Sequence, residues 1–164
     1  MKRTQRGFTL IEIMVVITIV AVLMGAVTLS FPRTGDNLLK EQAERFAALI
    51  TLAQDEAILQ SSELGLLVHK GGYIYYRNEN NSWVPYSSRP FSRRQFPVGI
   101  SSSMVIEGDS FSLKDGDKQM PQIIIFSSGE MTAFTYRLTY QKDSNITLKV
   151  SATGDIEKIV ELNE

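Results

Sequence analysis

Glu12 is the residue whose chemistry most needs an explanation, because it lies inside an otherwise uncharged apolar run. The run extends from Phe8 to Phe31 and contains 24 residues, of which Glu12 alone carries a charge. A carboxylate placed in a membrane helix costs about 2.5–3.5 kcal/mol on insertion scales, so an acid at such a position is a functional residue by default. A nearby cation would neutralise it. The sequence therefore predicts that Glu12 pairs with a positive group.

The apolar run itself predicts a membrane helix. As a helix it would measure about 36 Å, against a hydrocarbon thickness of roughly 30 Å. Lys2, Arg3 and Arg6 precede the run, whereas only Arg33 follows before Asp36. By the positive-inside rule, the N-terminus stays in the cytoplasm and the rest of the chain is exported.

A cleaved secretory signal peptide and a plain uncleaved anchor are the alternative interpretations of this segment. The run exceeds the ~7–15 residues of a signal-peptide core. It also contains an acid, and it lacks a small-residue cleavage site, the nearest cluster being Met24-Gly25-Ala26. These features argue against a secretory signal. A plain anchor fits the length but leaves Glu12 unexplained.

The order of residues around Gly7 resembles a known processing signal. Arg6-Gly7-Phe8-Thr9-Leu10-Ile11-Glu12, followed by an apolar run, resembles the class III signal of type IV pilins and type II secretion pseudopilins. In that family a membrane aspartyl peptidase cuts after the glycine and methylates the new amino terminus. The resemblance implies cleavage between Gly7 and Phe8, N-methylation of Phe8, and an assembly role for Glu12.

Simple electrostatics is consistent with this cleavage. Removing the first seven residues leaves 14 basic against 18 acidic residues, a formal charge of −4. The cut also creates a positive amine at Phe8, one helical turn from Glu12 and at similar depth in the membrane. Within one subunit, or between neighbours in a filament, the amine and the carboxylate can neutralise each other.

The residues after the apolar run predict a second, amphipathic helix. Pro32 and Gly35 interrupt the first helix, and Asp36 or Asn37 can cap the next one. From Leu38 to about Gln60, apolar residues recur with 4-3-4-3-4 spacing, and they are Leu39, Ala43, Phe46, Ile50, Ala53 and Ala57. The charged residues expected on the opposite side are Lys40, Glu41, Glu44, Arg45, Asp55 and Glu56. The apolar stripe should pack on a sheet formed by the remaining chain.

Beyond Ser61 the period changes to that of strands. We expect Leu64, Leu66 and Val68 to face one side and their neighbours the other. Further strands are expected at 73–77, 83–84, 105–106, 111–113, 123–126, 134–140, 146–150 and 156–160. The stretch from Pro85 to Ile100 is rich in loop-forming residues.

A second resemblance involves the C-terminal part. The segment Phe126–Ile156, with Ser127-Ser128-Gly129 and Thr153-Gly154-Asp155, resembles H-type minor pseudopilins of type II secretion (the GspH family) and the related FimT/FimU minor pilins. The implied fold is α+β and pilin-like, with a long N-terminal helix packed on an antiparallel, strand-rich domain. Minor pilins of the pilus branch often carry a C-terminal disulfide, and this chain has no cysteine. The secretion branch is therefore favoured.

Other candidate chemistry is weak. His69 is a lone histidine, so we expect it to be a structural residue at a strand end. Asp115-Gly116-Asp117 lacks the ligand spacing of a calcium loop. Arg89, Arg93 and Arg94 with Tyr86, Phe91 and Phe96 form a basic-aromatic cluster that could contact nucleic acid, although a solvated loop or a pilin contact is favoured. We predict no catalytic residue, metal site or cofactor.

The expected organisation has four parts, which are a leader at 1–7, a transmembrane helix at 8–31, an amphipathic stalk helix at 32–60 and a periplasmic strand-rich domain at 61–164. The resemblance implies a subunit of the pseudopilus tip in the bacterial inner membrane. Its implied partners are the prepilin peptidase/methyltransferase, other minor and major pseudopilins, the inner-membrane assembly platform and secreted substrates. A type IV minor pilin acting in pilus assembly or DNA uptake is one alternative. A membrane-anchored periplasmic enzyme or binding domain is another.

Overall fold

The computed structural model describes residues 9–28, 35–106, 109–111, 120–141 and 144–161. The chain divides into two units at residues 33 and 34, and each unit is described by itself. The first contains helix α1 (Leu10–Thr28), whose described side chains, at positions 9–21, are exposed. Among the residues covered by the structure, no helix has the length and apolar character needed to cross a membrane. The expected transmembrane segment at 8–31 extends beyond the described residues at both ends.

The second unit consists of helix α2 (Gly35–Leu59) and two antiparallel sheets. Sheet A has the order β3-β2-β1-β7, with β4 also paired to β2. Sheet B has the order β10-β9-β8-β5-β6. The strands are β1 (Leu64–His69), β2 (Gly72–Glu79), β3 (Ser82–Pro85), β4 (Arg94–Gln95), β5 (Ile100–Ile106), β6 (Asp109–Phe111), β7 (Ile123–Ile125), β8 (Phe134–Tyr140), β9 (Ser144–Val150) and β10 (Ile156–Glu161).

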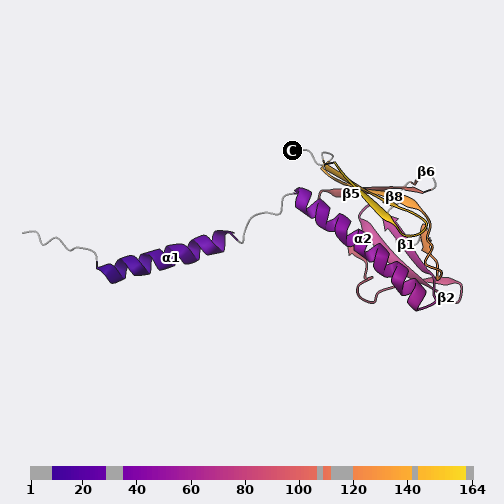
Figure 1. Ribbon diagram of the computed structural model, residues 1–164, viewed down its shortest axis with the longest axis horizontal. Coiled ribbons are helices and arrows are strands. Elements are labelled where there is room, and N and C mark those ends of the chain that lie inside the picture. Colours follow the sequence, from indigo (N-terminus) through magenta and orange to yellow (C-terminus); the bar gives the residue numbers. More distant parts are fainter. Residues whose placement is uncertain (1–8, 29–34, 107–108, 112–119, 142–143, 162–164) are drawn as a thin grey trace, which may run out of the picture. The chain divides into compact units, whose positions relative to one another are not determined.

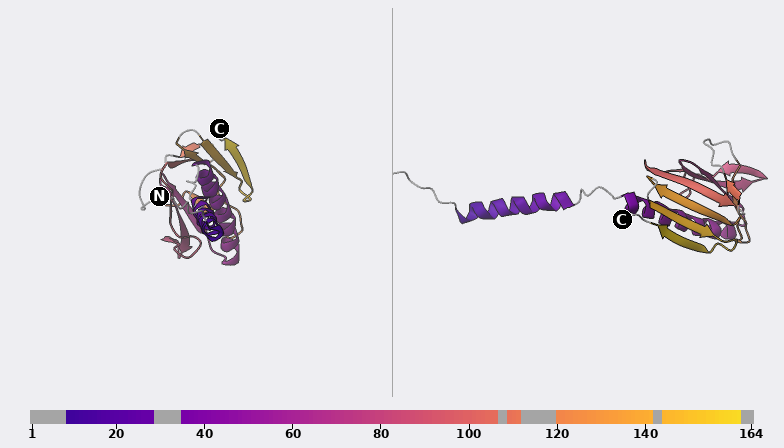
Figure 2. Two further views of the ribbon diagram at one scale, coloured as in Figure 1. Left: turned by 90° about the vertical axis from the view of Figure 1, so that its left-hand side faces the viewer. Right: turned by 90° about the horizontal axis from the view of Figure 1, so that it is seen from above.

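Helix α2 packs on both sheets, as Figures 1 and 2 show. All six residues of the predicted apolar stripe are completely buried. Phe46 lies at the centre of the stripe. Its ring is stacked on Tyr136 of β8 at 4.3 Å between centroids and meets Tyr73 of β2 edge-on at 5.2 Å. One side chain therefore joins the helix to both sheets, which confirms the predicted packing of helix on sheet.

The strands in the C-terminal part lie close to the predicted ranges. Phe134, Tyr136 and Leu138 of β8 are buried opposite Val150, Leu148 and Ile146 of β9. β10 completes that edge of sheet B. Lys158 of β10 lies opposite buried Leu148 and its ammonium reaches Glu44 of α2 at 3.4 Å. A charge on the inner face of an edge strand discourages pairing with another chain.

Strand β1 of sheet A follows the predicted alternation, with both of its faces covered. Leu64, Leu66 and Val68 join the core that contains α2, and every residue of β1 is buried. On the second face Leu67 packs with a separate cluster formed by Ile74, Tyr76 and Trp83. A strand covered on both faces has no polar side, so its sequence pattern cannot show which face meets α2.

Two further expectations need correction. Helix α2 begins at Gly35, before Asp36 and Asn37, which we had expected to precede it. Glu56, placed by the helical wheel on the side opposite the apolar stripe, is half-buried and bonded to sheet A. Helix α2 contacts both sheets, so its flanks are covered as well as its apolar stripe. A helical wheel divided into one buried and one exposed half therefore misplaces residues that lie near the border between the two halves.

Candidate functional site

The N-terminal motif lies mostly outside the described residues. Gly7 and Phe8, the predicted cleavage and methylation positions, are not among them. Glu12 is described, and it stands exposed in the first turn of α1. Its amide donates to the Thr9 carbonyl at 3.1 Å and lies 3.4 Å from the Thr9 hydroxyl, so Thr9 caps the helix. A carboxylate in a first helical turn also interacts favourably with the helix dipole.

Two turns in the C-terminal part are held together by one side chain of α2. The Gln54 amide nitrogen donates to the Gly129 carbonyl at 2.6 Å and to the Thr153 carbonyl at 2.9 Å. The two turns are also joined directly, because the Met131 amide donates to the Ala152 carbonyl at 2.9 Å. Gln54 therefore fixes the turn after β7 and the turn before β10 on the same flank of α2. We call this group the Gln54 clamp.

The glycines of the Gln54 clamp are required by its geometry. Gly129 and Gly154 both have φ of +89°, a region that side chains with a Cβ rarely adopt. A Cβ on Gly154 would lie 2.5 Å from the Gln54 amide, and one on Gly129 would lie 2.9 Å from Ile58 Cδ1. Small residues in both turns thus let the main chain approach α2.

Hydroxyl groups stabilise the second turn from within. The Thr153 hydroxyl donates to Asp155 Oδ2 at 2.7 Å, and the Asp155 amide donates to the Ser151 hydroxyl at 3.0 Å. The Asp155 carbonyl accepts from the Ser151 amide at 3.0 Å, which closes the turn. These residues belong to the segment whose order resembles H-type pseudopilins. In the structure, residues 151–155 of that segment shape the turn before β10.

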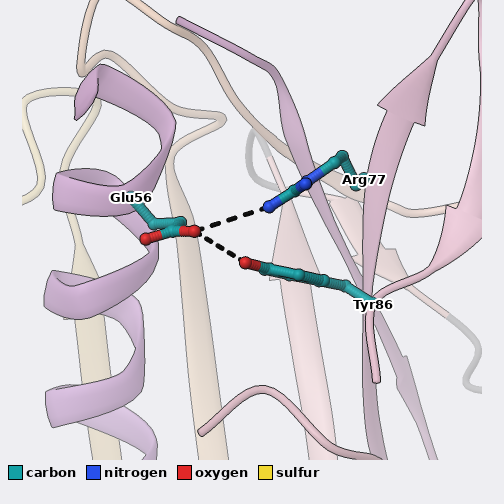
Figure 3. A network of polar contacts seen from close by, with 3 residues as sticks. All are labelled: Glu56, Arg77 and Tyr86. Carbon is teal, nitrogen blue, oxygen red and sulfur yellow. Dashed lines mark hydrogen bonds and ion pairs between the residues drawn. The ribbon is translucent and has the colours of Figure 1, made fainter. Parts of the chain in front are cut away.

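A polar network joins the other flank of α2 to sheet A (Figure 3). The Tyr86 hydroxyl donates to Glu56 Oε1 at 2.6 Å, and Arg77 reaches the same oxygen at 3.4 Å. The Arg77 guanidinium also lies 4.2 Å from the Tyr86 ring centre. Burial, and then the hydrogen bond to Glu56, raise the pKa of Tyr86. The phenol therefore stays protonated and acts as a donor in a structural contact.

The basic-aromatic cluster is separated by the fold. Phe91 is buried and packs against Tyr75 and Tyr86, while Phe96 packs against Tyr73. Tyr86 belongs to the Glu56 network. Phe91 therefore belongs to the interior, and Tyr86 and Phe96 are partly buried against the core, so none of the three rings is fully exposed for stacking on nucleic-acid bases.

The described residues give little support for a catalytic site or a metal site. His69 is buried at the end of β1 and its Nδ1 accepts from the Gly71 amide at 3.2 Å, which is the structural arrangement we predicted. Within the described ranges, no three His, Cys, Asp or Glu residues are grouped to hold a metal ion. Asp115-Gly116-Asp117 lies outside those ranges. Burial raises the pKa of Tyr75 and Tyr136 far above the working range of a general base.

Sequence reasoning did not identify Gln54 or the pairing of Glu56 with Tyr86. Both residues stand on α2 at the margins of the apolar stripe, where a polar side chain can reach the edge of a sheet. The two glycine-containing turns were visible in the sequence. Their common partner on α2 was not, because Gln54 is 75 and 99 positions from the carbonyls that it binds.

Comparison with known proteins identifies the family of the chain. A family model described as "Prokaryotic N-terminal methylation motif" matches residues 2–28, and one described as "Type II transport protein GspH" matches residues 42–154. The chain belongs to the GspH family. The second match includes α2 from Gln42 onward, all of sheet A, sheet B without β10, and the Gln54 clamp. The resemblance seen in the sequence is thereby confirmed.

Curated relatives in this family share the length of the chain. The Pseudomonas aeruginosa protein named "Type II secretion system protein H" is 34% identical, with 93% of each chain covered. A protein of the same name from Aeromonas hydrophila is 27% identical over 87% of this chain and 85% of the relative.

Solved structures confirm the pilin-like α+β fold. The minor pseudopilin EpsH from the type 2 secretion system of Vibrio cholerae superposes with a TM-score of 0.66 at 18% identity, covering 77% of this chain and 99% of that one. The solution structure of Escherichia coli GspH gives a TM-score of 0.60 at 20% identity, covering 75% of this chain and 88% of that one.

Proposed function

We propose that this GspH-family protein is a minor pseudopilin that enters the tip of a type II secretion pseudopilus and supports protein export. The main support is that one chain matches two family models, the methylation motif at residues 2–28 and GspH at residues 42–154. The curated relatives carry the name of a secretion protein over nearly the same length. The absence of cysteine also favours this branch over the pilus branch.

In this proposal the apolar segment 8–31 holds the protein in the inner membrane after export of the domain that follows. The leader 1–7 keeps its basic residues in the cytoplasm until the prepilin peptidase cuts after Gly7. The segment 32–60 forms the stalk and 61–164 the periplasmic domain. The protein acts as a structural subunit, and its partners are other pseudopilins, the assembly platform and exported substrates.

Glu12 supplies the assembly step. Its carboxylate gains a partner when cleavage creates the amine of Phe8, either in the same subunit or in a neighbour. Pairing removes the cost of an isolated carboxylate in the membrane, so an unpaired subunit is less stable than one docked in the filament. The exposure of Glu12 at the start of α1 leaves its carboxylate available for such a partner.

The processing step is tested by Gly7→Val, with Thr9→Val as a control that places the same side chain beyond the junction. We expect Gly7→Val to stay uncut, because the peptidase must accept an extended backbone at a position where a side chain obstructs it. Gel mobility and N-terminal mass spectrometry measure the cut and the methyl group. A normally cut, methylated Phe8 in Gly7→Val would refute the assignment.

The assembly step is tested by Glu12→Leu and Glu12→Gln, with Thr18→Val as a control on the same helix. Both Glu12 variants should insert and be processed normally, since each removes a charge from the apolar run. Their cross-linking to other pseudopilins and the secreted enzyme activity should fall at equal membrane levels. If both variants cross-link and secrete like wild type, the charge-pairing step is wrong, although the family assignment would stand.

A further inference from the structure

The segment between β3 and β6 concentrates positive charge in an otherwise acidic chain. Residues 82–106 contain three arginines, at positions 89, 93 and 94, and no lysine, aspartate or glutamate. Since the mature chain would carry a formal charge of −4, this segment is a local exception. Concentrated charge of one sign attracts ligands of the opposite sign.

Arg94 is held firmly. It lies in β4 directly opposite Tyr73 of β2, so the two side chains share one face of sheet A. The Phe96 amide donates to the Gly71 carbonyl at 2.8 Å, and the Phe96 ring packs on Tyr73 at 5.9 Å. A Cβ on Gly72 would collide with the Arg94 carbonyl. These contacts fix the main chain that carries Arg94.

Two buried donors at this position lack a protein partner. Arg94 Nε and the Tyr73 hydroxyl are both inaccessible to solvent, and neither has a hydrogen-bond partner among the described residues. Tyr73 as a whole is 1% exposed. A buried donor without an acceptor costs roughly 1–3 kcal/mol, so an acceptor bound at this position would stabilise the folded domain.

Charged groups on β4 and α2 influence the Tyr73 phenol. Burial raises the pKa of Tyr73, while the charge of Arg94 and then that of Arg45 act in the opposite direction. Arg45 is bonded to Glu41 at 3.0 Å. The charge of Arg45 is therefore already compensated by Glu41.

We propose that Arg94 and Tyr73 bind an oxyanion, a carboxylate or a phosphate group, on the face of sheet A that packs against α2. Guanidinium and phenol groups supply only the donors that such an anion accepts, and charge-assisted hydrogen bonds are stronger than neutral ones. A water molecule would satisfy the phenol but would leave the positive charge of Arg94 uncompensated. The site goes beyond the pseudopilin assignment, and its test is independent of secretion.

Thermal unfolding of the full chain in a neutral detergent tests the site. The melting temperature is measured at pH 7 and constant ionic strength while sodium chloride is replaced by sodium phosphate or sodium acetate. A ligand that binds the folded protein raises the melting temperature in a concentration-dependent way. We expect one or both oxyanions to stabilise the wild type relative to chloride. Phosphate alone would indicate a phosphate group, and acetate alone a carboxylate.

Variants separate the site from a general salt effect. Arg94→Gln should weaken the apparent affinity about tenfold or more, as expected for a lost charge-assisted hydrogen bond. Tyr73→Phe keeps the ring packing on Phe46 and should weaken it less. Arg137→Gln is the control, since Arg137 bonds to Thr147 on sheet B at 3.2 Å. The proposal is overturned if neither oxyanion raises the melting temperature of the wild type. It is also overturned if the oxyanion raises the melting temperatures of Arg94→Gln and Tyr73→Phe as much as that of Arg137→Gln.

Discussion

Replacing Gln54 by alanine should loosen both C-terminal turns at once. The change removes the amide that donates to Gly129 at 2.6 Å and to Thr153 at 2.9 Å, and it leaves two carbonyls without that donor. Alanine is the best helix former, so the propensity of α2 for helix is not reduced. Any loss of stability therefore measures the Gln54 clamp and not the helix.

The size of the effect follows from the surroundings of the two bonds. A typical hydrogen bond contributes about 0.5–1.5 kcal/mol net, and water can reach at least the Thr153 carbonyl in the variant. Two bonds therefore predict a loss of about 1–3 kcal/mol. For a chain of this size that corresponds to a fall in melting temperature of roughly 2–12 °C.

The assay is thermal and urea unfolding of the full chain in detergent, followed by circular dichroism. Thr51→Ala is the matched control, because the Thr51 hydroxyl donates to the Ala47 carbonyl of its own helix, at 3.4 Å. Gln54→Glu adds a sharper test. At pH 7 a carboxylate facing two carbonyl oxygens should destabilise the domain more than alanine does. The stability of Gln54→Glu should recover at acidic pH, where the carboxylate is protonated. If Gln54→Ala and the control unfold at the same temperature and the same urea concentration, the Gln54 clamp contributes nothing measurable and our account of the C-terminal turns is wrong.

Two further outcomes are expected. Gly154→Ala should cost about 1–3 kcal/mol, because it forces a positive φ and a collision with Gln54; Gly71→Ala, where a Cβ would meet only the His69 ring at 3.7 Å, should cost clearly less in the same urea titration. The raised pKa values of Tyr75 and Tyr136 predict stability that is constant below about pH 10 and falls above it, since these phenols ionise only on unfolding. Their phenolate absorbance should therefore appear together with the loss of circular dichroism, and phenolate from every tyrosine in the folded protein would contradict the burial.

The sequence alone determined the features that depend on neighbours along the chain. The apolar stripe of α2 and the pairing of β8 with β9 follow from side-chain periods of 3.6 and 2, which are fixed by local backbone geometry. The Gly7–Glu12 motif is likewise a contiguous pattern. Each could be read without knowing where the rest of the chain goes, and the predicted burial of Phe46 was correct for this reason.

Only the tertiary structure decided which distant residues meet. The second buried face of β1 depends on Trp83 arriving from another strand, and the half-buried position of Glu56 depends on the hairpin that carries Tyr86. Gln54 binds carbonyls that local periodicity cannot connect to it, and the orphan donors of Tyr73 and Arg94 become neighbours only when β4 pairs with β2. Contacts of this kind are set by packing of the whole domain, because a helix flank or a strand edge acquires a partner only after the sheets have formed around it.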